Sequence, residues 1–186
     1  MDNVIGSDEF DGSQRVDIAV SENGISATIR KLHQVAAACQ KLDPGVAMSL
    51  RGEALRLGES LESVVQGAAV VALQTAVLAS PVDTGLLRSN WAVKINKSRP
   101  ASYFTPETDR EGIKTIDEGT AVINTTDREP GQIIWISNSA PHSVACEHGW
   151  SGQAPSGMTT LARQAGEQFA RNRHIILEAI DNGRRN

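Results

Sequence analysis

Residues 80–91 read Ser80-Pro81-Val82-Asp83-Thr84-Gly85-Leu86-Leu87-Arg88-Ser89-Asn90-Trp91 and separate two different patterns of sequence. A long run with few charges and helical spacing precedes them, and short alternating segments follow. Pro81 cannot continue the helix, and Asp83-Thr84-Gly85 is typical of a turn. We therefore expect a rigid corner between a helix and a sheet, in which Asp83 caps the turn and Gly85 supplies unusual backbone angles.

The segment before the corner predicts one long helix. Asp43-Pro44 is typical of an N-cap followed by the first helical turn, and apolar residues then recur every three or four positions up to Ala79. Val64–Ala79 carries no charge, so we expect it to be buried all round, in the core or between subunits. It is too short and too polar to cross a bilayer. A continuous helix over residues 44–79 would be roughly 54 Å long, so we expect it to bend at a glycine or to reach a neighbouring subunit.

Upstream of this helix the sequence predicts an arm and a hairpin. Residues 1–15 are acidic and are expected to form a flexible arm, with neither the basic nor the apolar region of a signal peptide. Apolar residues alternate over 16–20 and again over 25–29, which predicts a β-hairpin. A helix that begins near Ser26 is the alternative, because apolar residues there also recur every three and four positions.

Downstream of the corner we expect the rest of a small sheet and its helices. The predicted elements are a strand over 91–96, an exposed loop over 98–112, a short helix within 111–126, a central strand over 133–138, a brief helix over 141–148 ended by Gly149, and a helix over 155–180 stopped by Asp181-Asn182-Gly183. The predicted fold class is α/β (α+β): a small, mostly antiparallel sheet flanked by a long N-terminal helix and a C-terminal helix. Residues 16–183 would form one domain, and 184–186 a basic tail.

Composition narrows the possible functions. The 186 residues are 40% hydrophobic and 22% charged, which is ordinary for one soluble domain. A formal net charge of −4 argues against a protein that grips nucleic acid through its phosphates. Cys39 and Cys146 show no metal-ligand spacing, which favours a reducing, cytosolic environment.

A second unusual cluster is Cys146-Glu147-His148-Gly149-Trp150-Ser151-Gly152-Gln153-Ala154-Pro155-Ser156-Gly157-Met158. With His142 it suggests a cysteine-dependent or metal-dependent hydrolase, since Cys146 and His148 could act as nucleophile and base. Bases of nucleophilic sites generally come from elsewhere in the chain, however, and the spacing fits no known zinc site. Asp83-Thr84-Gly85 also matches the aspartic protease triplet, but it occurs only once.

Charged and aromatic residues of the two clusters suggest structural contacts. We hypothesise that Arg88 and Glu147 pair across the fold and lock the corner against the second cluster. Trp91 and Trp135 are candidate core or interface anchors. Trp150 stands between glycines on an expected loop, which favours an interface.

Taken together, the two clusters and the segment Ile136-Ser137-Asn138 followed by Pro141-His142 resemble the HK97 gp10-like family of tailed-bacteriophage neck and tail-completion proteins. The resemblance spans about residues 60–175, in the family's order. His142 stands where the family usually has tyrosine, and the first 45 residues have no obvious counterpart. The matching residues, which the resemblance marks as structural or interface positions, are Pro81, Asp83, Thr84, Gly85, Arg88, Trp91, Asn138, Pro141, Glu147, Gly149, Trp150, Gln153, Ala154, Pro155, Gly157 and Met158.

The resemblance implies a virion protein that performs no reaction. Family members form a ring, commonly of six copies, in the neck between the head connector and the tail tube, as joining, completion or terminator proteins. The expected partners are other copies of the chain, neighbouring neck, connector and tail-tube proteins, and genomic DNA that passes through the lumen without specific binding. We expect assembly in the host cytoplasm, no membrane contact, no cofactor and no metal. The alternatives are the hydrolase built on Cys146, His148 and His142, and a cytosolic toxin-like or adaptor domain.

Overall fold

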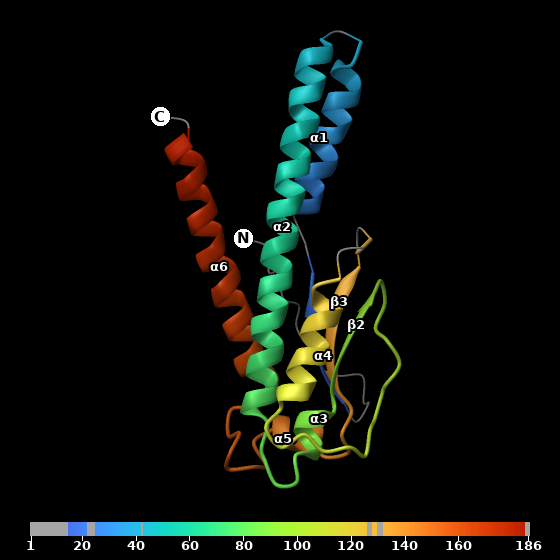
Figure 1. Cartoon of the computed structure of the whole chain (residues 1–186), viewed down its shortest axis with the longest axis vertical. Coiled ribbons are helices and arrows are strands. Elements are labelled where there is room, and N and C mark those ends of the chain that lie inside the picture. The colour runs from blue at the N-terminus through green and yellow to red at the C-terminus, as the bar shows by residue number, and fades with distance from the viewer. Residues whose placement is uncertain (1–14, 22–24, 42, 126–127, 130–131, 185–186) are drawn as a thin grey trace.

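The computed structural model describes residues 15–21, 25–41, 43–125, 128–129 and 132–184 (Figure 1). Helices and strands alternate irregularly along the chain, and a long helix stands beside a small sheet. The elements are β1 (Val16–Val20), α1 (Ile25–Cys39), α2 (Pro44–Ala79), α3 (Leu86–Ser89), β2 (Trp91–Asn96), α4 (Ile113–Ile123), β3 (Ile133–Asn138), α5 (Ser143–Glu147) and α6 (Thr159–Arg184).

The sheet has three antiparallel strands in the order β1-β3-β2, which confirms the α+β class and the central position of β3. Ile18 of β1 and Val93 of β2 both lie opposite Ile136 of β3. This register places alternate residues of the three strands on one face of the sheet, where they join the side chains of α2 and α6 in a single core; they are Val16, Ile18, Val20, Trp91, Val93, Ile134 and Ile136. Ile133 and Trp135 alternate with the buried residues of β3 and lie half-buried on the other face of the sheet, so the continuous apolar run contributes to both faces.

Helix α2 begins as the sequence predicts. The Asp43 carboxylate accepts hydrogen bonds from the Gly45 and Val46 amides at 2.9 and 3.1 Å, and Pro44 occupies the first turn. The helix then continues for 36 residues without interruption. Its first half projects beyond the sheet and pairs with α1, and its second half lies between α6 and α4 (Figure 1). Because α1 of the same chain covers the projecting half, the full length of α2 is accommodated within one chain.

The predicted hairpin near the N-terminus is wrong, and its helical alternative is correct. Residues 16–20 form a strand, but 25–29 belong to α1. The alternation of apolar residues covers only five positions, whereas apolar residues recur every three or four positions as far as Ala36, which is fully buried. The longer pattern identifies the helix. The expected boundary of the flexible arm also moves, because Arg15 is buried and donates to Asp17 and to the Pro100 carbonyl. Residues 1–14 lie outside the described part of the chain.

The C-terminal helix differs from its prediction at both ends. It begins at Thr159 rather than at 155, because Gly157 adopts a left-handed conformation with φ 76° that a helix cannot contain. The expected stop at 181–183 is also wrong, since α6 continues to Arg184. Arg184 therefore belongs to the helix, while 185–186 of the predicted tail lie outside the described residues.

The charge-free part of α2 is not buried all round. Most of it lies in the core, but Gln74 is exposed and Leu78 keeps 57% of its surface accessible. The sheet and α4 cover one side and α6 another, which leaves this narrow stripe open. The expectation that this run is too short and too polar to cross a bilayer is wrong for the longer stretch Leu61–Ala79, which is long and apolar enough by length and composition alone, although half of it is buried within the protein. Its packing in the core accounts for the lack of charge.

Candidate functional site

The two sequence clusters meet at one end of the molecule, where α2 stops (Figure 1). Ser80 is the point of contact. Its hydroxyl donates to the Ala76 carbonyl at 2.8 Å, accepts from the Trp91 indole N–H at 2.8 Å, and lies 3.2 Å from the Met158 sulfur. Trp91 and Met158 are both buried. One hydroxyl at the end of α2 thus joins the corner to the second cluster.

Arg88 does not pair with Glu147, so the predicted ion pair is wrong. Its guanidinium donates to the carbonyls of Leu78 and Ser80 at 3.1 and 3.3 Å, and to the Arg110 carbonyl at 2.9 Å. The last carbonyls of a helix lack partners within the helix and carry partial negative charge. Arg88 satisfies these groups, which sequence spacing alone could not show, and thereby fixes the direction in which the chain leaves α2.

The turn itself is built by different atoms from those expected. Asp83 is exposed and makes no hydrogen bond with the described residues, whereas the Thr84 hydroxyl accepts from the Leu86 amide at 3.3 Å. The predicted capping role of Asp83 is therefore wrong. Gly85 does adopt a left-handed conformation, with φ 95°. A side chain there would lie 2.6 Å from the Arg110 amide, so glycine also permits the close approach of the following loop.

The loop over 97–112 is anchored to the corner, which the sequence did not indicate. The Asn90 side chain donates to the Thr105 carbonyl and accepts from the Thr105 amide, both at 2.9 Å. Ser89 donates to the Glu107 carbonyl at 2.6 Å. Asn90 lies within residues 80–91, but both of these hydrogen bonds are made with Thr105, fifteen residues further along the chain. Only the three-dimensional arrangement identifies it as a residue of the site.

Asp109 caps the start of α4. Its carboxylate accepts from the amides of Gly112 and Thr115 and from the Thr115 hydroxyl, each at 2.9 Å. Desolvation is the largest single influence and raises the pKa of Asp109, but the hydrogen bonds from Thr115 and Gly112 and the charge of Lys114 together outweigh it, so the pKa lies below the ordinary value of 3.8. The ionised carboxylate is therefore the form that the folded protein prefers.

This lowered pKa of Asp109 predicts a specific acid sensitivity. A group whose pKa is lower in the folded state stabilises the fold above its ordinary pKa, and the stabilisation is lost as the pH falls through the folded value. We expect Asp109→Asn to lower the melting temperature at pH 7, and the difference from the unmodified protein to shrink below about pH 3.8. Thermal unfolding of both proteins between pH 7 and pH 2.5 measures this. A difference that stays constant with pH would contradict the capping role.

Asn138 connects the central strand to the corner. It is fully buried at the end of β3, where its amide nitrogen donates to the Leu87 carbonyl at 2.7 Å and its oxygen accepts from the Ala140 amide at 3.0 Å. Pro141 follows on the surface. The Asn138 side chain thus binds a backbone group of α3 and one just after its own strand, which assigns it a structural role.

Glu147 caps α6. Its carboxylate accepts from the amides of Met158 and Thr159 at 2.7 and 2.9 Å, and from the Thr159 hydroxyl. A carboxylate is favoured there because the first amides of a helix lack internal partners. Gly157 makes this geometry possible, since a side chain on it would lie 2.6 Å from the Glu147 carbonyl oxygen.

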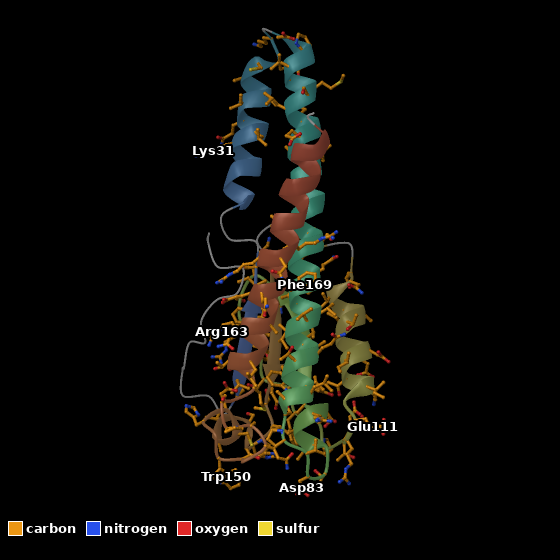
Figure 2. The ribbon with its side chains drawn as sticks, turned by 90° about the vertical axis from the view of Figure 1, so that its left-hand side faces the viewer. Lys31, Asp83, Glu111, Trp150, Arg163 and Phe169 are labelled. Atoms are coloured by element: carbon orange, nitrogen blue, oxygen red, sulfur yellow. The ribbon has the colours of Figure 1, made fainter. Side chains whose placement is uncertain are left out.

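The exposed loop of the second cluster is held against the corner. The Gln153 side chain accepts from the Val82 amide at 3.0 Å and donates to the Val82 carbonyl at 3.4 Å. Ala154 is buried beneath it, and Gly149, with φ 78°, allows the backbone to pass close to Pro155. Trp150 points outward from this braced loop with 76% of its surface accessible (Figure 2).

Cys146 does not have the surroundings of a catalytic thiol. It is 3% exposed within the core, and burial raises its pKa, which disfavours the reactive thiolate. The His148 ring lies on the surface, 2.7 Å from the Val144 carbonyl. Among the described residues no three His, Cys, Asp or Glu side chains are placed to hold a metal ion.

Comparison with protein-family models, with curated proteins and with solved structures finds no match to this chain. The function is therefore argued from the arrangement of its own residues. The two clusters lie together, use their polar groups to hold backbone segments, and present an aromatic side chain to the outside.

Proposed function

We propose that the chain is a structural virion protein of a tailed phage, which forms a homo-oligomeric ring in the neck between the head connector and the tail tube. The observation that carries the proposal is the network at the end of α2. There the residues that resemble the neck family contact one another and fix the shape of one end of the molecule. A subunit of a ring needs such rigid ends, because small angular errors between neighbours prevent closure.

The polar side chains of the two clusters and of Asn138 support a structural role for this end of the molecule. Arg88, Asn138, Glu147 and Gln153 each direct their side chains to backbone groups of other segments. Catalytic groups, in contrast, need to reach a substrate from a cleft. These residues hold the corner, the central strand, the loop over 149–158 and the start of α6 in fixed positions. Their shared use of backbone partners is what a scaffold requires.

The exposed part of this region offers a contact surface, which we call the end surface and define by Val82, Asp83, Thr84 and Trp150. Trp150 is a large aromatic side chain on a loop that is already ordered, and residues of this kind dominate binding at protein interfaces. Figure 2 shows Asp83 and Trp150 together at the same end of the molecule. The proposed role of the end surface is to contact the next component of the neck. The net charge of −4 suits a ring that lets DNA pass.

The mass of the purified protein tests the ring. We expect native mass spectrometry and light scattering to give an oligomer of about 120 kDa, which corresponds to six chains of 19.9 kDa. We also expect the chain among the proteins of purified phage particles. A strict monomer that is absent from particles would refute the proposal.

A further inference from the structure

We infer that the ring closes through one contact, in which the outer face of α4 of one copy packs against the outer face of α6 of the next copy. This inference rests on the proposed function and deepens it, because it names the two surfaces that meet. The contact is heterologous, meaning that different surfaces of the two copies are used, as a ring of more than two subunits requires.

The two helices lie along the same stretch of α2. Gly119 of α4 lies close to Leu73 of α2, and Gly112, the residue just before α4, lies close to Val77. On the other helix, Phe169 contacts Gly67. The residue just before α6, Met158, contacts Ser80, so α6 spans the same length of α2.

These contacts place particular residues at matching heights. Asp117 stands between Gly112 and Gly119, and Arg163 stands midway between Met158 and Phe169, so both lie beside the same turn of α2. Rotation about a ring axis parallel to α2 leaves height unchanged. In a flat ring, Arg163 of one copy therefore comes opposite Asp117 of the next.

The charges of the two faces are complementary. Residues 107–118, at the start of α4, contain five acidic side chains and two basic ones. The first half of α6, residues 159–173, contains three arginines and one glutamate. Asp117 and Arg163 form no ion pair with any described residue, so both charges remain available to a neighbour. Opposite charges at this position would select the neighbour and set its register.

Exposed apolar side chains accompany these charges. Ile113 on α4 is 58% exposed, and Leu161 on α6 is 38% exposed. Ile113 lies one helical turn from Asp117, on the side toward the end of α2. Leu161 is two residues from Arg163 and therefore lies on a different side of α6. Figure 2 shows Glu111, beside α4, and Arg163 on opposite sides of the molecule, as a head-to-tail contact requires.

Charge reversal tests this contact with the full chain. Asp117→Arg alone places two arginines together, and Arg163→Asp alone places two aspartates together, so we expect each variant to need at least tenfold higher concentration to form the ring. An equimolar mixture of the two variants should restore assembly, because every contact in an alternating ring then joins opposite charges. Lys31→Asp reverses an exposed charge on α1, away from both faces and from the end surface, and serves as the control, which should assemble normally.

Sedimentation velocity and native mass spectrometry measure the outcome, with thermal unfolding to show that each variant is folded. Ring formation by each single variant at unchanged concentration would overturn the contact while leaving the proposed ring intact. Failure of the mixture to assemble would also overturn it, since the pairing of the two faces would then be wrong. A monomeric unmodified protein would instead refute the proposed function, and the inference with it.

Discussion

Gly157→Ala is expected to destabilise the protein by about 3 kcal/mol, or roughly 10 °C in melting temperature for a chain of this size. Gly157 has φ 76°, where a side chain is strained. The added methyl group would also lie 2.6 Å from the Glu147 carbonyl oxygen and from its carboxylate. The cap on α6 would have to move. Thermal or urea unfolding, followed by circular dichroism, measures the loss.

Gly152→Ala is the matched control for this prediction. Gly152 lies in the same loop, outside the left-handed conformations, with open space where a side chain would be added. We expect its melting temperature to stay within about 2 °C of the unmodified protein. Equal melting temperatures for the two variants would show that the close approach of Gly157 to Glu147 does not stabilise the fold.

Trp150→Ala is expected to leave folding unchanged and to impair incorporation into particles. The side chain is 76% exposed, so its removal takes little from the core. If Trp150 anchors the end surface, its loss should cost about 2 kcal/mol or more of binding, which is roughly a 30-fold loss of affinity. The measurement is the amount of the protein in particles when the variant replaces the natural chain, together with the titre of infectious phage.

Tyr103→Ala provides the comparison for Trp150→Ala. Tyr103 is also an exposed aromatic residue, at 55%, but it lies in the loop over 97–112 and outside the end surface. We expect this variant to assemble and to infect normally. Normal incorporation of Trp150→Ala, with a melting temperature equal to that of the unmodified protein, would contradict the role of the end surface.

Most elements could be predicted because their signals are local. Asp43-Pro44 marks the start of α2 through a side chain that caps the helix two and three residues later. The apolar run over 133–136 predicts a central strand because both of its neighbours are apolar on the core face. Gly85 and Gly149 were recognised as special positions from their places in turn sequences, and both have positive φ.

The contacts of the site could not be predicted in the same way. Arg88 and Glu147 were paired because they have opposite charges, yet each instead binds the unsatisfied backbone groups at a helix end. Sequence shows which side chains are charged but not which amides and carbonyls lack partners. Asn90 and Asp109 were missed for the same reason, since their roles depend on a loop whose path is set by distant contacts.

The contacts of the Ser80 hydroxyl bear on the order in which the chain folds during synthesis. Its three partners lie at residues 76, 91 and 158, so the last of them leaves the ribosome long after α1 and α2. The hairpin of α1 and α2 uses short-range contacts and can form early, whereas the network around Ser80 has to wait for nearly the whole chain. This end of the molecule is therefore completed only late in synthesis, and if it is the binding end that we propose, half-made subunits on neighbouring ribosomes would lack it.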